Sequence, residues 1–214
     1  MNKVVIFDLD GTVLDTRQDI ADCMNIAIKD FGYEQRSYDE YKQVIGNDAP
    51  NFMRKLLGDL PEDYLMKIWD YYIPIVEKYG TEKTKIFDGI KDVIITLKER
   101  GYKLCLCTNK TPFELEPFVD KFLSDLHFDY IVGVGGTKDA KPSPNEVFNI
   151  LNKFNALAQN CYLVGDGETD ILTALNAGVT PVGALWGNRT LEQLSNVGAN
   201  IFAKTPLDLI DIIK

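Results

Sequence analysis

The chain opens with a continuous apolar run, Val4–Phe7, that is ended by Asp8, Asp10 and Gly11. Such a run is typical of a parallel strand buried on both faces of an α/β sheet. Residues i and i+2 of an extended chain face the same way, so Asp8 and Asp10 are expected to converge beyond the strand, where α/β proteins bind ligands. Two like charges so close need a cation or a shared proton, and an all-oxygen cluster suits Mg²⁺. Taken alone, the same residues also describe an acidic turn in which Gly11 supplies backbone freedom.

The next part of the chain has helical periodicity only. Apolar residues recur at helical spacing over 16–29, 38–45, 51–57 and 61–79, and no convincing strand lies in the stretch from 38 to 79. Pro74 is predicted to kink or interrupt the last of these helices. A helical block this long exceeds the crossover that joins two parallel strands. It predicts an inserted all-helical cap.

Strands and helices alternate in the rest of the chain. Strands are expected at 103–107, 130–134, 161–164 and 180–185, with a short edge at 201–202. This alternation predicts an α/β fold, a Rossmann-like parallel sheet with helices on both faces. We therefore expect residues 1–15 and 83–214 to form an α/β catalytic core and residues 16–82 to form the helical cap.

The composition argues against several classes of partner. The chain has 32 acidic and 23 basic residues, a net charge of −9, which disfavours nucleic acid and anionic membrane surfaces. It shows no signal segment and no apolar run long enough to span a bilayer. The four cysteines lack metal-ligand spacing, and Cys105 and Cys107 alternate inside a predicted strand, as in a reducing cytosol. We expect a cytoplasmic protein that is a monomer or a weak dimer.

Polar residues follow three of the predicted strands. The pairs are Asp8 and Asp10, Thr108 and Asn109, and Asp166 and Asp170. The carboxyl ends of parallel strands share one edge of a sheet, so these side chains are expected to meet there. An aspartate nucleophile can split phosphoryl transfer into two steps, and the transferred group then needs positive charge and hydrogen-bond donors. Mg²⁺, a threonine hydroxyl, an amide and a lysine such as Lys141 would supply them, although Thr108-Asn109 or Lys141 taken singly is an ordinary loop feature.

The order of these motifs resembles that of the haloacid-dehalogenase-like hydrolases, over essentially the whole chain and including the helical cap. The matching segments are Asp8-Leu9-Asp10-Gly11-Thr12, Thr108-Asn109, Lys141-Pro142 and Gly165-Asp166 with Asp170. Three further segments are similar to the phosphoglycolate-phosphatase-like branch: Thr108-Asn109-Lys110, Lys141-Pro142-Ser143-Pro144 and Ala184-Leu185-Trp186-Gly187-Asn188-Arg189.

The resemblance implies catalytic roles for the matching residues. Asp8 would be the nucleophile that becomes phosphorylated. Asp10 would protonate the leaving group and then activate water. The residues implied to bind the phosphoryl group are Thr108 and Lys141, through their side chains, and Gly11 and Asn109, through main-chain N–H groups.

The resemblance also implies Mg²⁺ as the cofactor. Asp8, Asp166 and the main-chain carbonyl of Asp10 would bind the metal. Asp170 would hold the metal's water shell or orient Lys141, and Lys141 would offset the charge of Asp8.

The expected function is that of a Mg²⁺-dependent phosphatase that hydrolyses a small phosphate monoester, phosphoglycolate-like, through an aspartyl-phosphate. A β-phosphoglucomutase-like phosphomutase and a pyrophosphatase of the same superfamily are alternatives; Thr108-Asn109-Lys110 favours the phosphatase. A non-catalytic phospho-acceptor module would need neither Asp10 nor the cap. Substrate choice is expected to lie in the cap, where Arg17 and Arg54 are candidates to grip a carboxylate. Lys110, Lys138 and Glu168 are expected to support the site or to be solvated.

Overall fold

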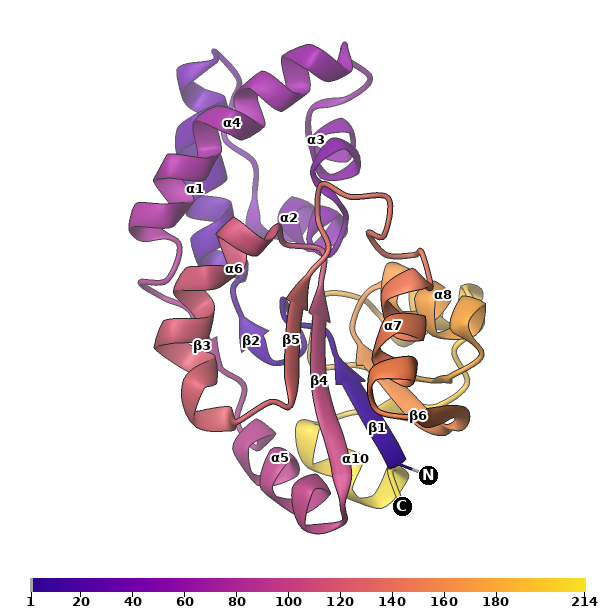
Figure 1. The fold of residues 1–214 in the computed structure, drawn as a ribbon. Helices are drawn as coiled ribbons and strands as arrows, with labels where there is room; N and C mark the ends of the chain where they lie inside the picture. Colours follow the sequence, from indigo (N-terminus) through magenta and orange to yellow (C-terminus); the bar gives the residue numbers. More distant parts are fainter. Residues whose placement is uncertain (1) are drawn as a thin grey trace.

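The computed structural model describes residues 2–214, and its core is one six-stranded sheet in which every neighbouring pair is parallel. The strand order is β5-β4-β1-β6-β7-β8, so the opening strand lies near the centre (Figure 1). The strands are β1 (Asn2–Phe7), β4 (Tyr102–Thr108), β5 (Tyr130–Gly133), β6 (Ala156–Gly165), β7 (Thr180–Ala184) and β8 (Phe202–Ala203). The predicted α/β architecture is confirmed.

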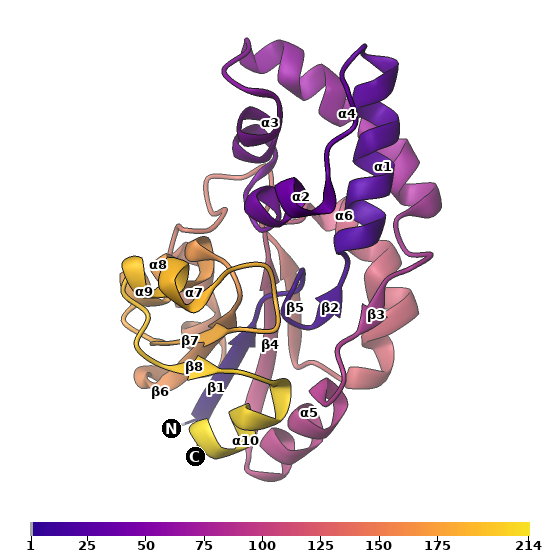
Figure 2. The same ribbon diagram turned by 180° about the vertical axis from the view of Figure 1, so that it is seen from behind.

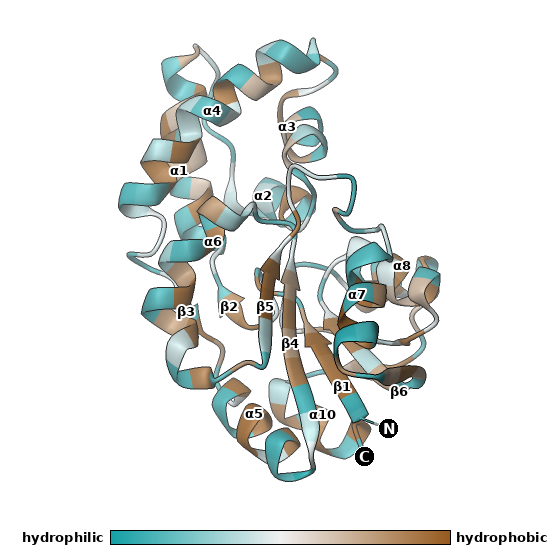
Figure 3. Ribbon diagram, viewed as in Figure 1, coloured by the Kyte–Doolittle hydropathy of each residue, from teal (hydrophilic) through white to brown (hydrophobic). Residues whose placement is uncertain are grey.

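Helices cover both faces of the sheet because its central strands are apolar on both sides (Figure 3). In β1, Val5 and Phe7 pack into one buried cluster, whereas Val4 and Ile6 pack into another on the opposite face. The first face is covered by α5 (Ile90–Glu99), α6 (Pro112–Phe118) and α10 (Leu209–Ile212), and the second by α7 (Asn145–Lys153) and α8 (Glu168–Ala177). The remaining short helices are a π-helix (Val119–Leu123), two 3-10 helices (Ser124–Leu126 and Pro206–Asp208) and α9 (Leu191–Asn196).

Four helices form the predicted inserted cap, which lies beyond the carboxyl ends of the central strands (Figures 1 and 2). They are α1 (Arg17–Asp30), α2 (Tyr38–Val44), α3 (Ala49–Leu57) and α4 (Glu62–Tyr79). Their apolar faces bury a cluster of their own, with members from Ile20 to Val76, that is separate from the clusters on the sheet. The helical insertion is confirmed, while its exact limits at residues 16 and 82 stay a prediction. No helix within residues 2–214 combines the length and the apolar character that crossing a membrane requires.

Two details differ from the expectations. α4 continues through Pro74, so the helix is not interrupted there, while a kink at Pro74 stays a prediction; Ile68, Tyr72 and Val76 on both sides of the proline pack in the buried cluster of the cap. Two short strands at the junction of cap and core, β2 (Leu14–Asp15) and β3 (Lys85–Ile86), pair antiparallel. With two residues each, they are too short to show the alternation that marks a strand in a sequence.

Candidate active site

The side chains expected to meet at the strand ends do so. Asp8 follows β1, Thr108 ends β4 and Asp166 follows β6, and these three strands are neighbours in the sheet. Lys141 enters from the loop between β5 and α7. All four side chains are buried. The polar residues that follow the apolar strands therefore lie together at one buried site beneath the cap.

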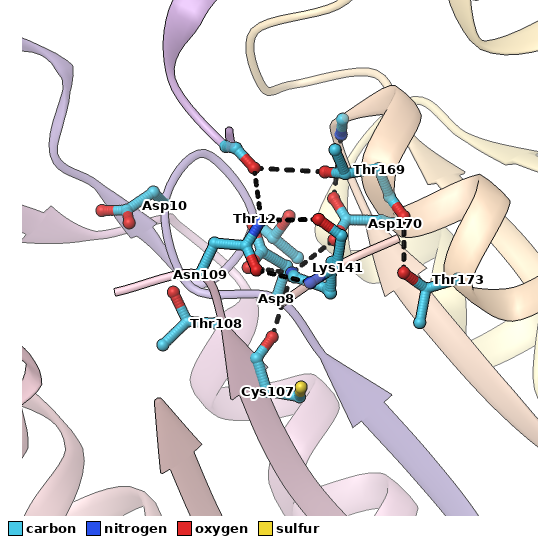
Figure 4. Close-up of polar contacts among 12 residues, drawn as sticks. Asp8, Asp10, Thr12, Cys107, Thr108, Asn109, Lys141, Thr169, Asp170 and Thr173 are labelled. Carbon is cyan, nitrogen blue, oxygen red and sulfur yellow. Dashed lines mark hydrogen bonds and ion pairs between the residues drawn. The ribbon is translucent and has the colours of Figure 1, made fainter. Parts of the chain in front are cut away.

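Lys141 lies at the centre of this site and contacts several of its residues (Figure 4). Its Nζ lies 2.7 Å from Asp8 Oδ1 and 2.5 Å from Asp170 Oδ1, and it donates to the main-chain oxygen of Cys107 at 3.0 Å. Burial lowers the pKa of Lys141, but the facing carboxylates of Asp170 and Asp8 more than offset this and hold it above its ordinary value. The ammonium therefore stays charged, and it leaves Asp8 Oδ2 outside the ion pair.

Three buried carboxylates form a group that fits a divalent cation. Ligand oxygens of Asp8, Asp166 and Asp170 all lie within 4.8 Å of one another. When all three carboxylates are ionised, they and their shared cation Lys141 carry a net charge of −2. Burial raises the pKa of Asp166 to about 6, with a further rise from Asp170. Burial also raises the pKa of Asp8 well above its ordinary value, and Asp170 and Asp166 add to the rise. An all-oxygen donor set with excess negative charge is what Mg²⁺ binds.

Asp166 is fixed by three donors. Its Oδ2 accepts from the main-chain N–H and the side-chain amide of Asn188, at 2.7 and 2.8 Å, and its Oδ1 accepts from the Thr12 hydroxyl at 3.1 Å. The buried Oδ1 of Asn188 has no hydrogen-bond partner among the described residues. An unpaired buried oxygen beside this carboxylate group is a further sign that the site is built around a cation or its water.

Asp10 is held apart from this group (Figure 4). Its Oδ1 accepts from the Thr16 hydroxyl at 2.6 Å, and its Oδ2 lies 3.0 Å from Nζ of Lys110. Thr16 stands at the N-cap of α1, but its side chain makes no capping bond; its hydroxyl donates to Asp10. Lys110 is buried, with its ammonium 4.8 Å from the centre of the Phe118 ring. Each aspartate of the first motif thus has its own lysine.

The predicted phosphate-donor role of Gly11 is not supported, because its main-chain N–H donates to the Leu14 carbonyl at 2.8 Å. The glycine serves another purpose. Its φ is +87°, and a Cβ there would lie 2.3 Å from Asp166 Oδ2. Gly11 is therefore required so that the turn after β1 can approach the carboxylate group.

Asn109 ties the Lys141 loop to the cap. Its Oδ1 accepts from the main-chain N–H of Lys141 at 2.8 Å, while its amide nitrogen donates to the carbonyls of Lys141 and Gly46, both at 3.1 Å. The hydroxyl oxygen of Thr108 accepts a hydrogen bond from the main-chain N–H of Lys110 at 3.3 Å. The second motif therefore orders the loop that carries the central lysine.

A narrow pocket of about 40 Å³ lies between this site and the cap. Asp8, Asp10, Thr108, Asn109 and Lys110 line it from the core, and Gly46, Asn47, Phe52, Trp69 and Tyr72 line it from the cap. The two arginines proposed for substrate carboxylates do not line it. Arg17 pairs with Asp15 at 3.1 Å, and Arg54 pairs with Glu62 at 3.1 Å.

Some residues of the site were not identified from the sequence. Lys110 was expected to support the site or to be solvated, yet it is buried against Asp10, and Thr16 and Asn188 were not predicted to touch a carboxylate. Lys110 had a weak signal, since it directly follows Thr108-Asn109. Thr16 and Asn188 had none, because each reaches its partner across a turn or between strand ends.

Comparison with known proteins agrees with this geometry. A family model described as haloacid dehalogenase-like hydrolase matches residues 5–184. The chain is 33% identical over 217 residues, 98% of this chain and 94% of the relative, to a protein of Caldanaerobacter subterraneus provisionally named pyrophosphatase PpaX. It is 32% identical over 219 residues, 99% of this chain and 96% of the relative, to a phosphoglycolate phosphatase of Aquifex aeolicus. A solved structure from Bacteroides fragilis, provisionally assigned to the haloacid dehalogenase-like hydrolases, has the same fold, with a TM-score of 0.90 at 24% identity over 98% of this chain and 100% of that one.

The chain therefore belongs to the haloacid dehalogenase-like hydrolases, which confirms the resemblance found in its four motifs. Within that family it is a phosphatase, and the expected enzyme class, a phosphoric monoester hydrolase, is confirmed.

Proposed function

We propose that this enzyme is a Mg²⁺-dependent phosphatase that cleaves a small phosphate monoester with an anionic leaving group, phosphoglycolate in the first place, through an aspartyl-phosphate on Asp8. The observation that carries the proposal is Lys110, the only cation among the described residues that line the pocket. The small pocket and the paired aspartates support it.

We also propose residues 1–15 and 83–214 as the catalytic core, residues 16–82 as the cap, and a cytosolic location. The location is supported by the cysteines, because all four are buried and none forms a disulfide.

In the first step, Asp8 is the nucleophile. Lys141 pairs with Asp8 Oδ1, so Oδ2 is the oxygen that attacks phosphorus. The bond from phosphorus to the leaving oxygen breaks, and protonated Asp10 delivers its proton to that oxygen. In the second step, Asp10 takes a proton from water, the water oxygen attacks phosphorus, and the bond to Asp8 breaks. The Thr108 hydroxyl would contact the phosphoryl oxygens, and Lys141 would do so by giving up one of its three hydrogen bonds to Asp8, Asp170 and the Cys107 carbonyl.

We propose Mg²⁺ as the cation for the carboxylate group. Asp8 and Asp166 would hold it together with the main-chain carbonyl of Asp10, and Asp170 would keep Lys141 in place through their 2.5 Å contact. When bound, the ion supplies positive charge that offsets these carboxylates and the phosphoryl oxygens. The Asn188 and Thr12 donors keep Asp166 oriented toward that position.

The pocket favours a small, negatively charged leaving group. At ~10–15 Å³ for each water-sized sphere, a cavity of about 40 Å³ is tight even for a small ester, so phosphoglycolate and pyrophosphate need the least widening of it and a nucleotide the most. Asp10 must carry a proton before it can protonate the leaving oxygen, and in that state Lys110 loses its counter-charge. A carboxylate or phosphate on the leaving group restores that charge balance next to Lys110.

Pyrophosphate is the second candidate substrate. Its leaving group is itself an anionic phosphate, which meets the same requirement at Lys110. The 33% identity to the relative provisionally named PpaX favours it specifically.

The test is phosphate release in Mg²⁺ from phosphoglycolate, pyrophosphate, p-nitrophenyl phosphate, a hexose phosphate and a nucleoside monophosphate. Preference for phosphoglycolate supports the proposal, and preference for pyrophosphate moves the assignment to the second candidate. Preference for the hexose phosphate or for the nucleotide would contradict the argument from pocket size.

Lys110→Met isolates the role of the leaving-group charge. We expect kcat/KM for phosphoglycolate to fall ~10–100-fold, the cost of losing one charged hydrogen bond in a sheltered site, and kcat/KM for p-nitrophenyl phosphate to fall much less. Lys138→Met is the matched control, because Lys138 is an exposed neighbour of the site loop. An equal loss on both substrates would show that Lys110 acts through Asp10 alone.

A further inference from the structure

Arg189 is a buried arginine that the reaction described above does not use. It belongs to the segment after β7 and its side chain is 2% exposed, whereas arginine is seldom buried without partners. Its Nε donates to Glu168 Oε2, on α8 of the core, at 2.6 Å. The rest of its guanidinium is directed at the cap.

The guanidinium of Arg189 contacts the end of cap helix α2. Its Nη2 donates to the main-chain oxygens of Gln43 and Ile45, at 3.0 and 3.2 Å, and its Nη1 donates to the main-chain oxygen of Lys42. The last carbonyls of a helix have no partners inside it, and they carry the negative end of the helix dipole. A core arginine therefore satisfies the orphan carbonyls of a helix in the cap.

The contact bears directly on the active site because the next residues form part of its pocket. Ile45, Gly46 and Asn47 line the pocket opposite Asp8 and Asp10. The Gly46 carbonyl receives two donors from the core, the Asn109 amide at 3.1 Å and the Thr169 hydroxyl at 3.2 Å. Arg189 and these two donors thus hold one cap segment, residues 42–47, against the strand ends.

We propose that Arg189 is a positioning residue that latches the cap segment 42–47 onto the core and so completes the closed pocket. Chain segments at β2 and β3 join the cap to the core. They lie on another side of the molecule from the end of α7 and from α9, which begins two residues after Arg189 (Figure 2). A rotation of the cap about that junction withdraws the carbonyls from Arg189 and opens the pocket to solvent. Closure excludes water from the site and brings the lining residues together. The proposal rests on the phosphatase activity but not on which ester is cleaved.

The first test is the kinetics of Arg189→Gln and Arg189→Lys with p-nitrophenyl phosphate. For Arg189→Gln we expect kcat/KM to fall ~10-fold or more, equivalent to ~1.4 kcal/mol, mainly through a higher KM. In Arg189→Lys, which keeps the positive charge that lowers the pKa of Asp166, the Mg²⁺ concentration for half-maximal rate should stay unchanged. Arg189→Lys keeps the charge but not the planar fork, so it should restore only part of the loss. A shifted Mg²⁺ requirement in Arg189→Lys would overturn the proposal, because it would show that the hydrogen bonds of Arg189 position the metal ligands and not the cap.

The second test is hydrogen exchange in the metal-loaded protein, which does not depend on activity. Amides in residues 42–48 should exchange at least ~10-fold faster in Arg189→Gln, while those of β1 and β4 keep their wild-type rates. Gln43→Ala is the matched control, since it removes the exposed side-chain contact of Gln43 with Gln193 (3.0 Å) but keeps the carbonyl that Arg189 binds. Equal exchange in Arg189→Gln and wild type would refute the latch, whereas an inactive wild type with faster exchange in the variant would refute only the proposed function.

Glu168→Gln covers the case in which both Arg189 variants fail to fold. Glu168 is about one-third exposed and orients Arg189 through Nε, so its change is compatible with folding. We expect a smaller effect in the same direction, ~2–5-fold in KM and in exchange of residues 42–48, as for one partly exposed ion pair. Wild-type values for both would overturn the proposal.

Discussion

Neutralising Asp8, the proposed nucleophile, is expected to inactivate the enzyme and to stabilise its metal-free fold. In Asp8→Asn the shape of the side chain is kept and one charge is removed. The group formed by Asp8, Asp166, Asp170 and Lys141 then carries a net charge of −1 in place of −2. The variant therefore separates what Asp8 does for catalysis from what its charge does to the fold.

The size of the effect follows from the distances. At an effective dielectric constant of about 20, two carboxylates no more than 4.8 Å apart repel by at least ~3.5 kcal/mol, so Asp166 and Asp170 together repel Asp8 by at least ~7 kcal/mol. Lys141 at 2.7 Å attracts Asp8 by ~6 kcal/mol on the same scale. These terms nearly cancel, so the cost of burying the charge decides the sign, and it is the main cause of the raised pKa of Asp8. We expect a net gain of about 2 kcal/mol, or ~4–8 °C in Tm for a chain of this length.

The assay is thermal unfolding at pH 7.5 in excess EDTA, with phosphate release measured in parallel. Because the folded pKa values of Asp8 and Asp166 lie above 3.8, the folded metal-free protein binds more protons than the unfolded chain. Wild-type stability in EDTA therefore falls as pH rises from 4 through about 6, the pKa of Asp166, and the advantage of Asp8→Asn should grow as pH rises through the raised pKa of Asp8. Mg²⁺ should narrow the difference, since it stabilises the wild type more.

Asp129→Asn is the matched control with the opposite sign. Asp129 is bound by Lys103 at 2.8 Å and by the Leu104 N–H, and these contacts hold its pKa below the ordinary value despite partial burial. Neutralising it should lower Tm slightly. If Asp8→Asn melts at or below the wild-type temperature in EDTA, or retains more than a tenth of the activity, the charge argument and the nucleophile assignment respectively are wrong.

Three further outcomes are expected. Gly11→Ala should cost at least ~2 kcal/mol and weaken Mg²⁺ stabilisation, because its Cβ would meet Asp166 at 2.3 Å and its φ is +87°; a wild-type melting curve in Mg²⁺ would count against this. Burial raises the thiol pKa of Cys23 and Cys107 to about 12, so at pH 8 neither should react with a disulfide reagent within minutes in the native protein, and all four thiols should do so in denaturant. Excess EDTA should stop phosphate release and added Mg²⁺ should restore it, while full activity in EDTA would remove the metal assignment.

The parts of the site that the sequence predicted share one property: they are short patterns at the ends of buried strands. A run such as Val4–Phe7 specifies a central strand, and parallel strands align their carboxyl ends, so Asp8, Thr108 and Asp166 had to meet. Lys141 was found because it stands in a motif with a fixed place in that order. The order and direction of the strands were therefore enough to predict that these residues meet, without knowledge of side-chain contacts.

The parts that could not be predicted use main-chain acceptors or cross between distant loops. The Arg189 and Asn109 contacts with the cap end on carbonyl oxygens, which every residue has, so the acceptors at residues 42–46 leave no trace in the sequence. Thr16 looks like an ordinary N-cap residue until the turn at Gly11 brings its hydroxyl to Asp10. Contacts of this kind follow from the packing of cap on core and not from local pattern.

The first motif shows how two adjacent carboxylates come to differ in chemistry. Alternation along a strand predicted that Asp8 and Asp10 would converge, and both do line one pocket. The strand, however, ends at Phe7, so the alternation does not extend to Asp10, whose carboxylate contacts Thr16 and Lys110 apart from the carboxylate group. Asp8 shares Lys141 with Asp170 in a buried group of net negative charge, whereas Asp10 has Thr16 and Lys110 to itself. A nucleophile must be ionised where the phosphoryl group arrives, and an acid must hold a proton where the leaving group departs. The negative group around Asp8 raises its pKa, so the proposed nucleophile needs a cation at the carboxylate group to stay ionised, and the proposed acid needs another anion to take its place beside Lys110.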